Sequence, residues 1–232
     1  MTKKEFKIIP ALDIRDIVKM ENLIREINDH PFVYGYKVGF SLGLTYGLPK
    51  IVETIRKYTK KPVIYDHQKA GTDIPDTGSV FAEVMKNAGL EEVIIFPQAG
   101  PVTEDSWIDA LIAKSLKVIV GGVMTHKSFL QSEGGFISDS GVEQIYSAAI
   151  KKGVTSFVVP LTKGGLVENL LQKIPFPTNS EFYSPGFGKQ GGNPCDFPSI
   201  KKHYLITGRS LLESKNPVEW LDKTKKELDE TV

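Results

Sequence analysis

Two aspartates and a lysine follow one short apolar run of the sequence. Asp66, Lys69 and Asp73 lie in the stretch YDHQKAGTDIPDTG (65–78), directly after the apolar residues PVIY (62–65). Charged side chains are costly at the point where a strand leaves a core, unless they are paired. A lysine held among carboxylates can stabilise a developing negative charge and deliver a proton to it. The stretch therefore indicates either a catalytic cluster on a strand-to-helix loop or a solvated turn that carries charges.

Short runs rich in Val and Ile alternate with amphipathic segments along the chain. Near-continuous apolar runs separated by helices are typical of a parallel sheet that is covered on both faces. Eight such units in 232 residues favour a single-domain (β/α)8 TIM barrel over residues 1–232, with a doubly wound open sheet as the alternative. Strands are predicted at 6–13, 33–39, 62–66, 91–97, 117–124, 155–161, 179–185 and 203–208, and helices at 14–29 and 78–89.

A barrel of this kind carries its functional residues just past the carboxyl ends of its strands. Asp13 ends the first predicted strand, Lys37 lies near the end of the second, and Asp66 ends the third. Thr125 and His126 follow the fifth predicted strand, SPGFGKQGG follows the seventh, and TGRS follows the eighth. Because the unusual polar residues fall at these ends on several strands, we favour the catalytic cluster over the charged turn.

Two segments near the end of the chain have the composition of a phosphate site. The loop SPGFGKQGGNP (184–194) is dense in glycine, which lets backbone N–H groups approach an anion closely. TGRSLLE (207–213) is predicted to place Gly208 and Arg209 at the start of the last helix, where free N–H groups and a guanidinium favour an anion. Either segment alone could be ordinary surface. Together they favour phosphate, because barrel enzymes often bind it on the loops after strands 7 and 8.

The composition excludes several classes of partner and site. Lys and Arg number 29 against 28 Asp and Glu, so no overall basic field would hold nucleic acid or an anionic membrane surface. The single cysteine, Cys195, excludes a disulfide framework and a cysteine-based metal cluster, and it suits a reducing cytoplasm. We find neither a signal peptide nor an apolar stretch near the roughly 20 residues of a membrane span, and we expect a cytoplasmic protein.

Four stretches together resemble the orotidine 5′-phosphate decarboxylase family. They are ALDIRD (11–16), YKVGFSL (36–42), the block from Asp66 to Thr77, and SPGFGKQGG (184–192) with ITGRSLLESKNP (206–217). The resemblance spans nearly the whole chain. It implies a (β/α)8 barrel that acts as a homodimer and converts orotidine 5′-monophosphate to UMP and carbon dioxide, and it implies that no metal or organic cofactor is needed.

The family resemblance also implies roles for individual residues. The catalytic charge array would consist of Lys69, Asp66, Asp73 and Lys37, with Lys69 delivering the proton. The segment that reaches into the partner subunit's site would be Asp73, Ile74 and Thr77. The substrate-binding residues would be Asp13 and Lys37 at the ribose, Thr125 beside the pyrimidine, Gln190 between base and phosphate, Arg209 at the phosphate, and Pro185, Gly186 and Gly208 as further contacts.

The catalytic stretch departs from the family pattern in its spacing. The family has Asp-x-Lys-x-x-Asp, whereas this chain has one more residue in each gap between Asp66, Lys69 and Asp73. On a regular strand, residues three apart point to opposite faces, so Lys69 would turn away from Asp66. A bulge at His67–Gln68 would return Lys69 to the site, and Gly71 gives the backbone freedom to absorb the second insertion.

Two other functions remain open from the sequence. The first is a sugar-phosphate decarboxylase or aldolase of the same superfamily, which stabilises an enediolate with Mg²⁺. Such a site would need a further carboxylate near the second strand, and YKVGFSLGL (36–44) has none. The second is a catalytically silent barrel that binds a phosphate ligand, which would keep Gln190 and Arg209 while the lengthened stretch from Asp66 to Asp73 no longer converges.

Overall fold

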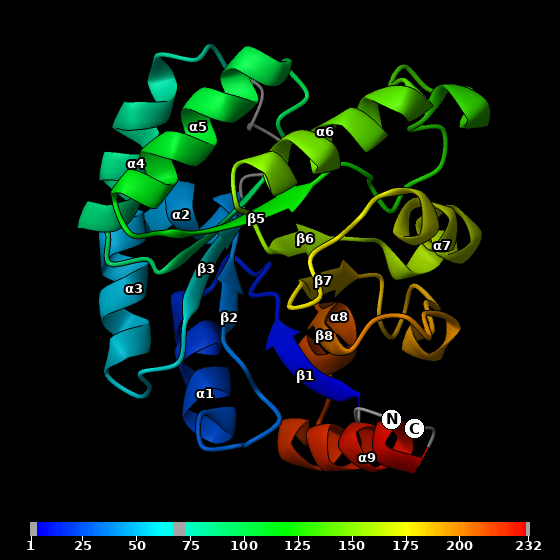
Figure 1. Cartoon of the computed structure of the whole chain (residues 1–232). Coiled ribbons are helices and arrows are strands. Elements are labelled where there is room, and N and C mark those ends of the chain that lie inside the picture. Colours follow the sequence, from blue (N-terminus) through cyan, green and yellow to red (C-terminus); the bar gives the residue numbers. More distant parts are fainter. Residues whose placement is uncertain (1–3, 67–72, 231–232) are drawn as a thin grey trace.

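Eight parallel strands form one sheet that curls into a barrel, with helices on its outside (Figure 1). The computed structural model describes residues 4–66 and 73–230. Strands that follow one another in the chain are neighbours from β2 to β8, and β8 pairs with β1. The strands are β1 Glu5–Pro10, β2 Tyr36–Val38, β3 Val63–Asp66, β4 Glu92–Ile95, β5 Lys117–Gly121, β6 Ser156–Val158, β7 Glu181–Pro185 and β8 Lys202–Thr207.

The barrel closes between β1 and β2 through isolated bridges rather than a continuous ladder. Ile8 bridges Val33 and Ala11 bridges Lys37, and the Leu12 N–H donates to the Lys37 carbonyl at 2.8 Å. On its other edge β1 pairs with β8 along its whole length. The predicted (β/α)8 barrel is therefore confirmed. The doubly wound alternative is wrong, because the two outer strands of an open sheet would not meet.

The strands bury both of their faces, as their Val- and Ile-rich composition requires. In β4, Ile94 belongs to the cluster inside the barrel, while Val93 and Ile95 pack in the layer between sheet and helices. All eight strands lie where the sequence predicts them, although most are shorter than predicted. The inner cluster consists of Ile9, Ala11, Ile64, Ile94, Phe96, Ile119, Val158, Tyr183, Tyr204 and Ile206.

A polar cluster fills the end of the barrel at which the strands begin. Glu92, Lys117 and Glu181 are the first residues of β4, β5 and β7. The Lys117 ammonium lies 2.5 Å from a Glu181 carboxylate oxygen and 2.7 Å from the Tyr183 hydroxyl. Burial raises the pKa of Glu92 above its usual value, although the Lys117 charge opposes the shift. Paired side chains therefore occupy this end of the barrel, and the cavity described below opens at the opposite end, where the strands finish.

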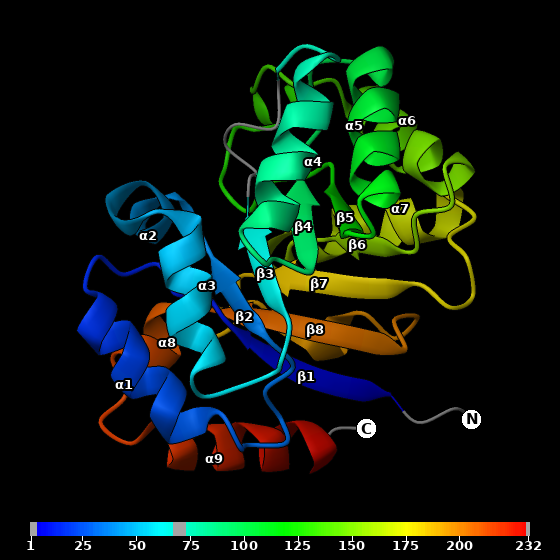
Figure 2. The same cartoon turned by 90° about the vertical axis from the view of Figure 1, so that its left-hand side faces the viewer.

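The helices surround the sheet, and α9 lies beside α1 on the outside of the barrel (Figure 2). The α1 helix begins at Ile17 because the Asp16 carboxylate accepts hydrogen bonds from the N–H groups of Val18 and Lys19, at 2.8 and 3.2 Å. Gly89, with φ of +82°, follows the end of α4 as predicted. The helices are α1 Ile17–Ile27, α2 Phe40–Tyr46, α3 Leu48–Arg56, α4 Thr77–Asn87, α5 Pro101–Ala113, α6 Asp139–Lys151, α7 Gly164–Lys173, α8 Arg209–Leu212 and α9 Pro217–Glu230.

One prediction about the helices is wrong. Arg209 begins α8, which has only four residues, whereas the last helix is α9 and starts at Pro217. A four-residue helix contributes little dipole, so any anion near Gly208 depends on side-chain charge and individual N–H groups. No helix in the described part of the chain is both long and apolar enough to cross a membrane.

Candidate active site

A cavity of about 360 Å³ opens at the end of the barrel where the strands finish. Its floor is apolar and comes from the inner cluster, with Phe96 lying close under the backbone of Gly121: a Cβ atom there would be 2.3 Å from the Phe96 ring. The predicted site residues that line the cavity are Asp13, Lys37, Asp66, Thr125, Pro185, Gly186, Gln190, Gly208 and Arg209. The structure thus brings together residues from six of the eight strand ends, as the barrel hypothesis requires.

Lys37 is the charged centre of the cavity. It lies on β2 and is only 6% exposed, with its ammonium 2.7 Å from an Asp66 oxygen and 3.5 Å from an Asp13 oxygen. Burial would lower the pKa of Lys37, but the neighbouring Asp66 and Asp13 carboxylates outweigh it, and the pKa is raised. The lysine therefore stays protonated at neutral pH. The ion pair also explains why an aspartate follows the apolar run PVIY. Asp66, at the end of β3, pairs with the buried Lys37 ammonium from the neighbouring strand β2.

The two carboxylates beside Lys37 differ in exposure. The Asp66 side chain is 6% exposed, whereas the Asp13 side chain is 57% exposed at the mouth of the cavity. A buried carboxylate can act on a substrate charge in a medium of low dielectric, whereas an exposed one is better suited to hydrogen bonding with hydroxyl groups. The roles of the two residues, Asp13 at the ribose and Asp66 in the charge array, stay predictions.

The segment from Asp73 to Thr77 does not line the cavity of its own chain. Asp73 and Ile74 are exposed, and the Asp73 carboxylate accepts a hydrogen bond from the Ile74 N–H at 2.7 Å. The Ile74 carbonyl accepts from the Thr77 hydroxyl at 2.7 Å and from the Trp107 indole at 3.1 Å. These contacts fix the segment to the start of α4 and to α5, so it is held in place outside its own cavity.

Lys69 lies outside the described residues. The same holds for the bulge predicted at His67–Gln68 and for Gly71, and the structure does not test whether the lengthened stretch returns Lys69 to the cavity. What the structure establishes is the position of its two ends: Asp66 is inside the cavity, and Asp73 is on the surface.

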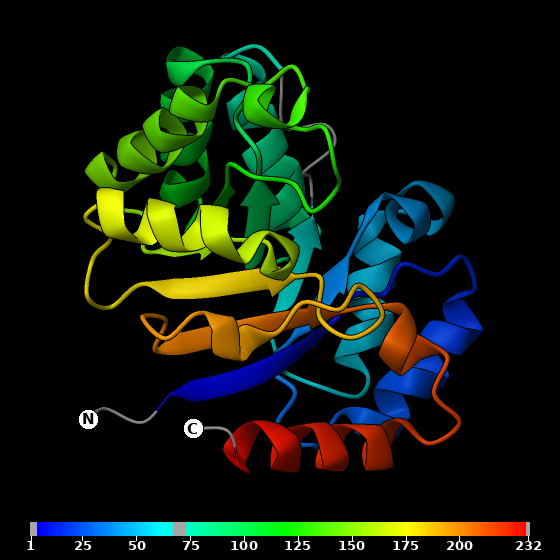
Figure 3. The same ribbon diagram turned by 90° about the vertical axis from the view of Figure 1, so that its right-hand side faces the viewer.

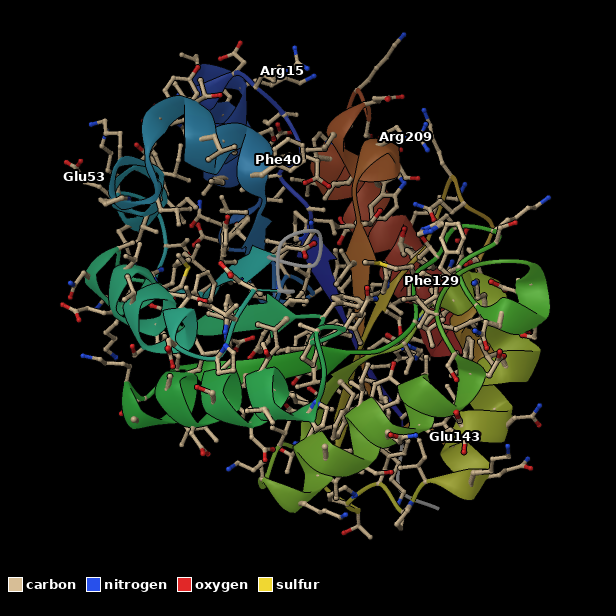
Figure 4. The ribbon with its side chains drawn as sticks, turned by 90° about the horizontal axis from the view of Figure 1, so that it is seen from above. Arg15, Phe40, Glu53, Phe129, Glu143 and Arg209 are labelled. Atoms are coloured by element: carbon tan, nitrogen blue, oxygen red, sulfur yellow. The ribbon has the colours of Figure 1, made fainter. Side chains whose placement is uncertain are left out.

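The glycine-rich loop forms one wall of the cavity and runs beside α8 (Figure 3). Gly186, Gly188 and Gly191 have φ angles of +104°, +83° and +78°, values that side-chain-bearing residues rarely adopt. The Gly192 N–H donates to the Gly186 carbonyl at 3.1 Å, which closes the loop on itself. Arg209 and Phe40 stand at the same end of the barrel, on α8 and α2 (Figure 4). This wall carries the cationic and N–H groups expected for a phosphate.

Sequence reasoning missed several residues of the cavity. Lys189 and Ser210 line it, and they lie beside Gln190 and Arg209 in the chain, so the two predicted motifs already contained them. Phe96 and Ile94 form part of the floor, which the alternation of β4 could have indicated. His126, which follows the fifth predicted strand, does not line the cavity, and its ring packs edge to face on Phe129 with 5.6 Å between the ring centroids.

The donor set offers little to a metal ion. Within residues 4–66 and 73–230, no group of three or more His, Cys, Asp or Glu side chains is arranged to hold one. In the cavity the two aspartates share the Lys37 ammonium, which already occupies the place between them that a cation would take.

Comparisons with known proteins agree on one family. The model of the orotidine 5′-phosphate decarboxylase / HUMPS family matches residues 7–224. Among curated proteins, the chain is 31% identical over 211 residues to an orotidine 5′-phosphate decarboxylase of Thermoplasma volcanium, covering 91% of this chain and 88% of that protein. It is also 31% identical over 230 residues to the enzyme of that name from Methanocaldococcus jannaschii, covering 96% of this chain and 99% of that protein.

Solved structures give the same result for the fold. The crystal structure of orotidine 5′-monophosphate decarboxylase from Methanocaldococcus jannaschii complexed with the inhibitor BMP has a TM-score of 0.80 and 25% identity, covering 97% of this chain and 98% of that one. The enzyme from Sulfolobus solfataricus has a TM-score of 0.76 and 23% identity, covering 98% and 99%.

Proposed function

The chain belongs to the orotidine 5′-phosphate decarboxylase / HUMPS family, and from this premise we propose how it decarboxylates orotidine 5′-monophosphate to UMP. The observation that carries the proposal is the buried Lys37 ammonium between the Asp13 and Asp66 carboxylates, in a cavity that also holds Arg209. As a carboxy-lyase, the enzyme breaks the bond between C6 of the pyrimidine and the carboxylate carbon. Carbon dioxide leaves, the electron pair stays on C6, and a proton replaces the lost group.

In the proposed site Asp66 lies beside the substrate carboxylate. Two like charges held together raise the free energy of the bound substrate, and the repulsion falls as the carboxylate charge disperses in the transition state. Lys37 pairs with Asp66, because its ammonium lies 2.7 Å from an Asp66 carboxylate oxygen. Lys69 stabilises the carbanion at C6 and then donates the proton to it.

The rest of the substrate is held by the cavity rim. The substrate contacts proposed there are Asp13 and Lys37 at the ribose, Thr125 at the pyrimidine, Gln190 at base and phosphate, Arg209 at the phosphate, and Pro185, Gly186 and Gly208 around them. Phosphate binding is remote from C6, so the binding energy released there can be used to hold the carboxylate against Asp66.

We also propose a homodimer with shared active sites. Asp73, Ile74 and Thr77 lie outside their own cavity, and they are the residues that the family resemblance assigns to the partner's site. Next to them, α4 exposes Val80 and Val84, which are 63% and 51% accessible and one helical turn apart. Ile74 is also exposed, at 59%, and we propose that a second copy covers these three apolar side chains.

A cytoplasmic location and a single domain over residues 1–232 belong to the same proposal. The supporting observation for the location is the use of one cysteine, Cys195, with no partner for a disulfide in the sequence. The supporting observation for the domain is that strands from β1 to β8 all belong to one sheet.

The deciding experiment is an absorbance assay with orotidine 5′-monophosphate in excess EDTA. We expect turnover to UMP that chelation leaves unchanged, since the proposed steps use only Asp and Lys side chains. Loss of turnover on chelation, restored by Mg²⁺, would instead indicate the enediolate-forming relatives. Tight nucleotide binding without any turnover would indicate the silent phosphate-binding barrel.

A further inference from the structure

Lys189 places a second cation at the phosphate end of the cavity. It lies in the middle of the loop Gly186–Gly192 and lines the same cavity as Arg209. Its ammonium forms an ion pair with the Glu213 carboxylate, and both side chains are about half exposed, at 50% and 52%. The Lys189 ammonium is therefore accessible to a ligand in the cavity. It is paired with Glu213, which does not itself line the cavity.

The backbone at Lys189 is fixed, although its side chain is exposed. The Lys189 N–H donates a hydrogen bond to the Ser210 hydroxyl at 2.8 Å. Gly188 leaves no room for a side chain at this contact, since a Cβ atom would lie 2.3 Å from the Ser210 oxygen, and its φ of +83° also favours glycine. Phe187, at the other side of Gly188, packs edge to face on Trp220 of α9 at 6.3 Å. The stem of Lys189 thus starts from a defined point beside Arg209.

Glu213 lies among several cations. It follows Arg209 by four residues, just after α8, and it pairs with Lys189. The hydrogen bond with Lys189, together with the charges of Lys189, Arg209 and Lys19, lowers the pKa of Glu213 below its usual value. The carboxylate is therefore ionised at neutral pH, close to the place proposed for a phosphate.

We propose that Lys189 is a second phosphate-binding residue and that Glu213 competes with the phosphate for it. In the free protein Lys189 pairs with Glu213, and on binding it exchanges this carboxylate for the phosphate of the nucleotide. The exchange favours dianionic ligands, because a dianion outcompetes a single carboxylate for an ammonium group more effectively than a monoanion or a neutral nucleoside does. The inference rests on the phosphate site of the proposed function and adds a residue that sets ligand selectivity there.

The competition has a signature that a purely structural role would not produce. Lys189→Ala should weaken binding of UMP about 5- to 50-fold, while the weak binding of uridine, which lacks the phosphate, stays unchanged. Glu213→Gln should tighten UMP binding about 2- to 5-fold, because the lysine no longer has to leave a carboxylate. In the double variant the Glu213→Gln gain should disappear, since the gain acts only through Lys189.

Calorimetric titration with UMP and with uridine tests this on the full chain. Lys215→Ala is the matched control, because it removes an exposed lysine nearby that does not line the cavity, and it should bind UMP as the wild type does. The proposal is overturned if Lys189→Ala binds UMP normally, if it loses uridine and UMP equally, or if Glu213→Gln gains the same factor without Lys189.

The binding experiments can refute the role of Lys189 without refuting the proposed decarboxylation, and the reverse also holds. Binding of UMP needs no turnover, so a wild type that does not decarboxylate orotidine 5′-monophosphate would refute the function while the Lys189 effects could still appear. Normal turnover with Lys189→Ala unchanged in both KM and UMP affinity would refute the inference alone. A wild type that binds UMP no better than uridine would overturn both.

Discussion

Replacing Lys37 by methionine should destabilise the protein strongly, because it breaks an ion pair in the barrel. The ammonium and the Asp66 carboxylate are 2.7 Å apart, and their side chains are 7% and 6% exposed. Removing one partner of such a pair costs about 3–5 kcal/mol, since the other charge loses its compensation in a medium of low dielectric. The Asp13 contact adds little, because it is longer, at 3.5 Å, and its carboxylate is 57% exposed. We therefore expect Lys37→Met to lower the free energy of unfolding by about 3–5 kcal/mol.

A double-mutant cycle in urea tests the magnitude. Asp66→Asn alone should also be costly, whereas Lys37→Met with Asp66→Asn should recover at least about 2 kcal/mol of the summed losses, because no unmatched charge of the pair is left. Unfolding can be followed by the fluorescence of Trp107 and Trp220. The control is Lys50→Met, which breaks the exposed pair with Glu53 and should cost under about 0.5 kcal/mol. If the Lys37 and Asp66 losses were simply additive, the buried pair would not be coupled and the reasoning would fail.

Three further predictions concern the site and its surroundings. Arg209→Ala should raise KM for orotidine 5′-monophosphate about 10- to 1,000-fold, because a charge-assisted contact with the phosphate is lost. Unchanged kinetics would show that the phosphate does not bind at Arg209. Lys69→Ala should abolish turnover while nucleotide binding survives, and mixing it with Asp73→Ala subunits should restore part of the activity; no recovery in proven heterodimers would remove Asp73 from the partner's site. Burial raises the pKa of Glu104 from 4.5 to about 8. As the pH rises from 4.5 to 8, the free energy of unfolding of the wild type should therefore fall relative to that of Glu104→Gln. If urea unfolding showed the same pH dependence for both proteins, the shift would be contradicted.

The strands and much of the site were predictable because one physical signal located both. Runs such as EEVIIFP (91–97) are too apolar for a strand with a solvated face, so they had to lie in a covered parallel sheet. Once the strand ends were located, Asp13, Lys37 and Asp66 could be placed together without any knowledge of side-chain contacts. The structure places these three side chains in one cavity, as predicted.

Other features depend on contacts that a linear pattern does not contain. TGRSLLE (207–213) predicts that Arg209 starts the last helix, but the helix that Arg209 begins ends at Leu212, and a separate last helix starts at Pro217. Lys189 was overlooked because a lysine in a glycine-rich loop has no periodicity to mark it. Its place follows only from the Ser210 hydrogen bond across the loop. The position of Lys69 depends on how two extra residues are absorbed, and it stays a prediction.

The incomplete pairing between β1 and β2 has a consequence for the local fluctuations of the barrel. Every other neighbouring pair forms a regular ladder, whereas here isolated bridges hold two strands together. Fluctuations should be largest along this line, and amide hydrogens there should exchange with solvent sooner than those between β1 and β8. Asp13, just after β1, and Lys37, on β2, lie on opposite sides of this join, with the Lys37 ammonium 3.5 Å from an Asp13 carboxylate oxygen. A nucleotide that contacts both residues would link β1 to β2 where their pairing is incomplete. Part of the binding energy would then appear as a higher melting temperature of the whole protein.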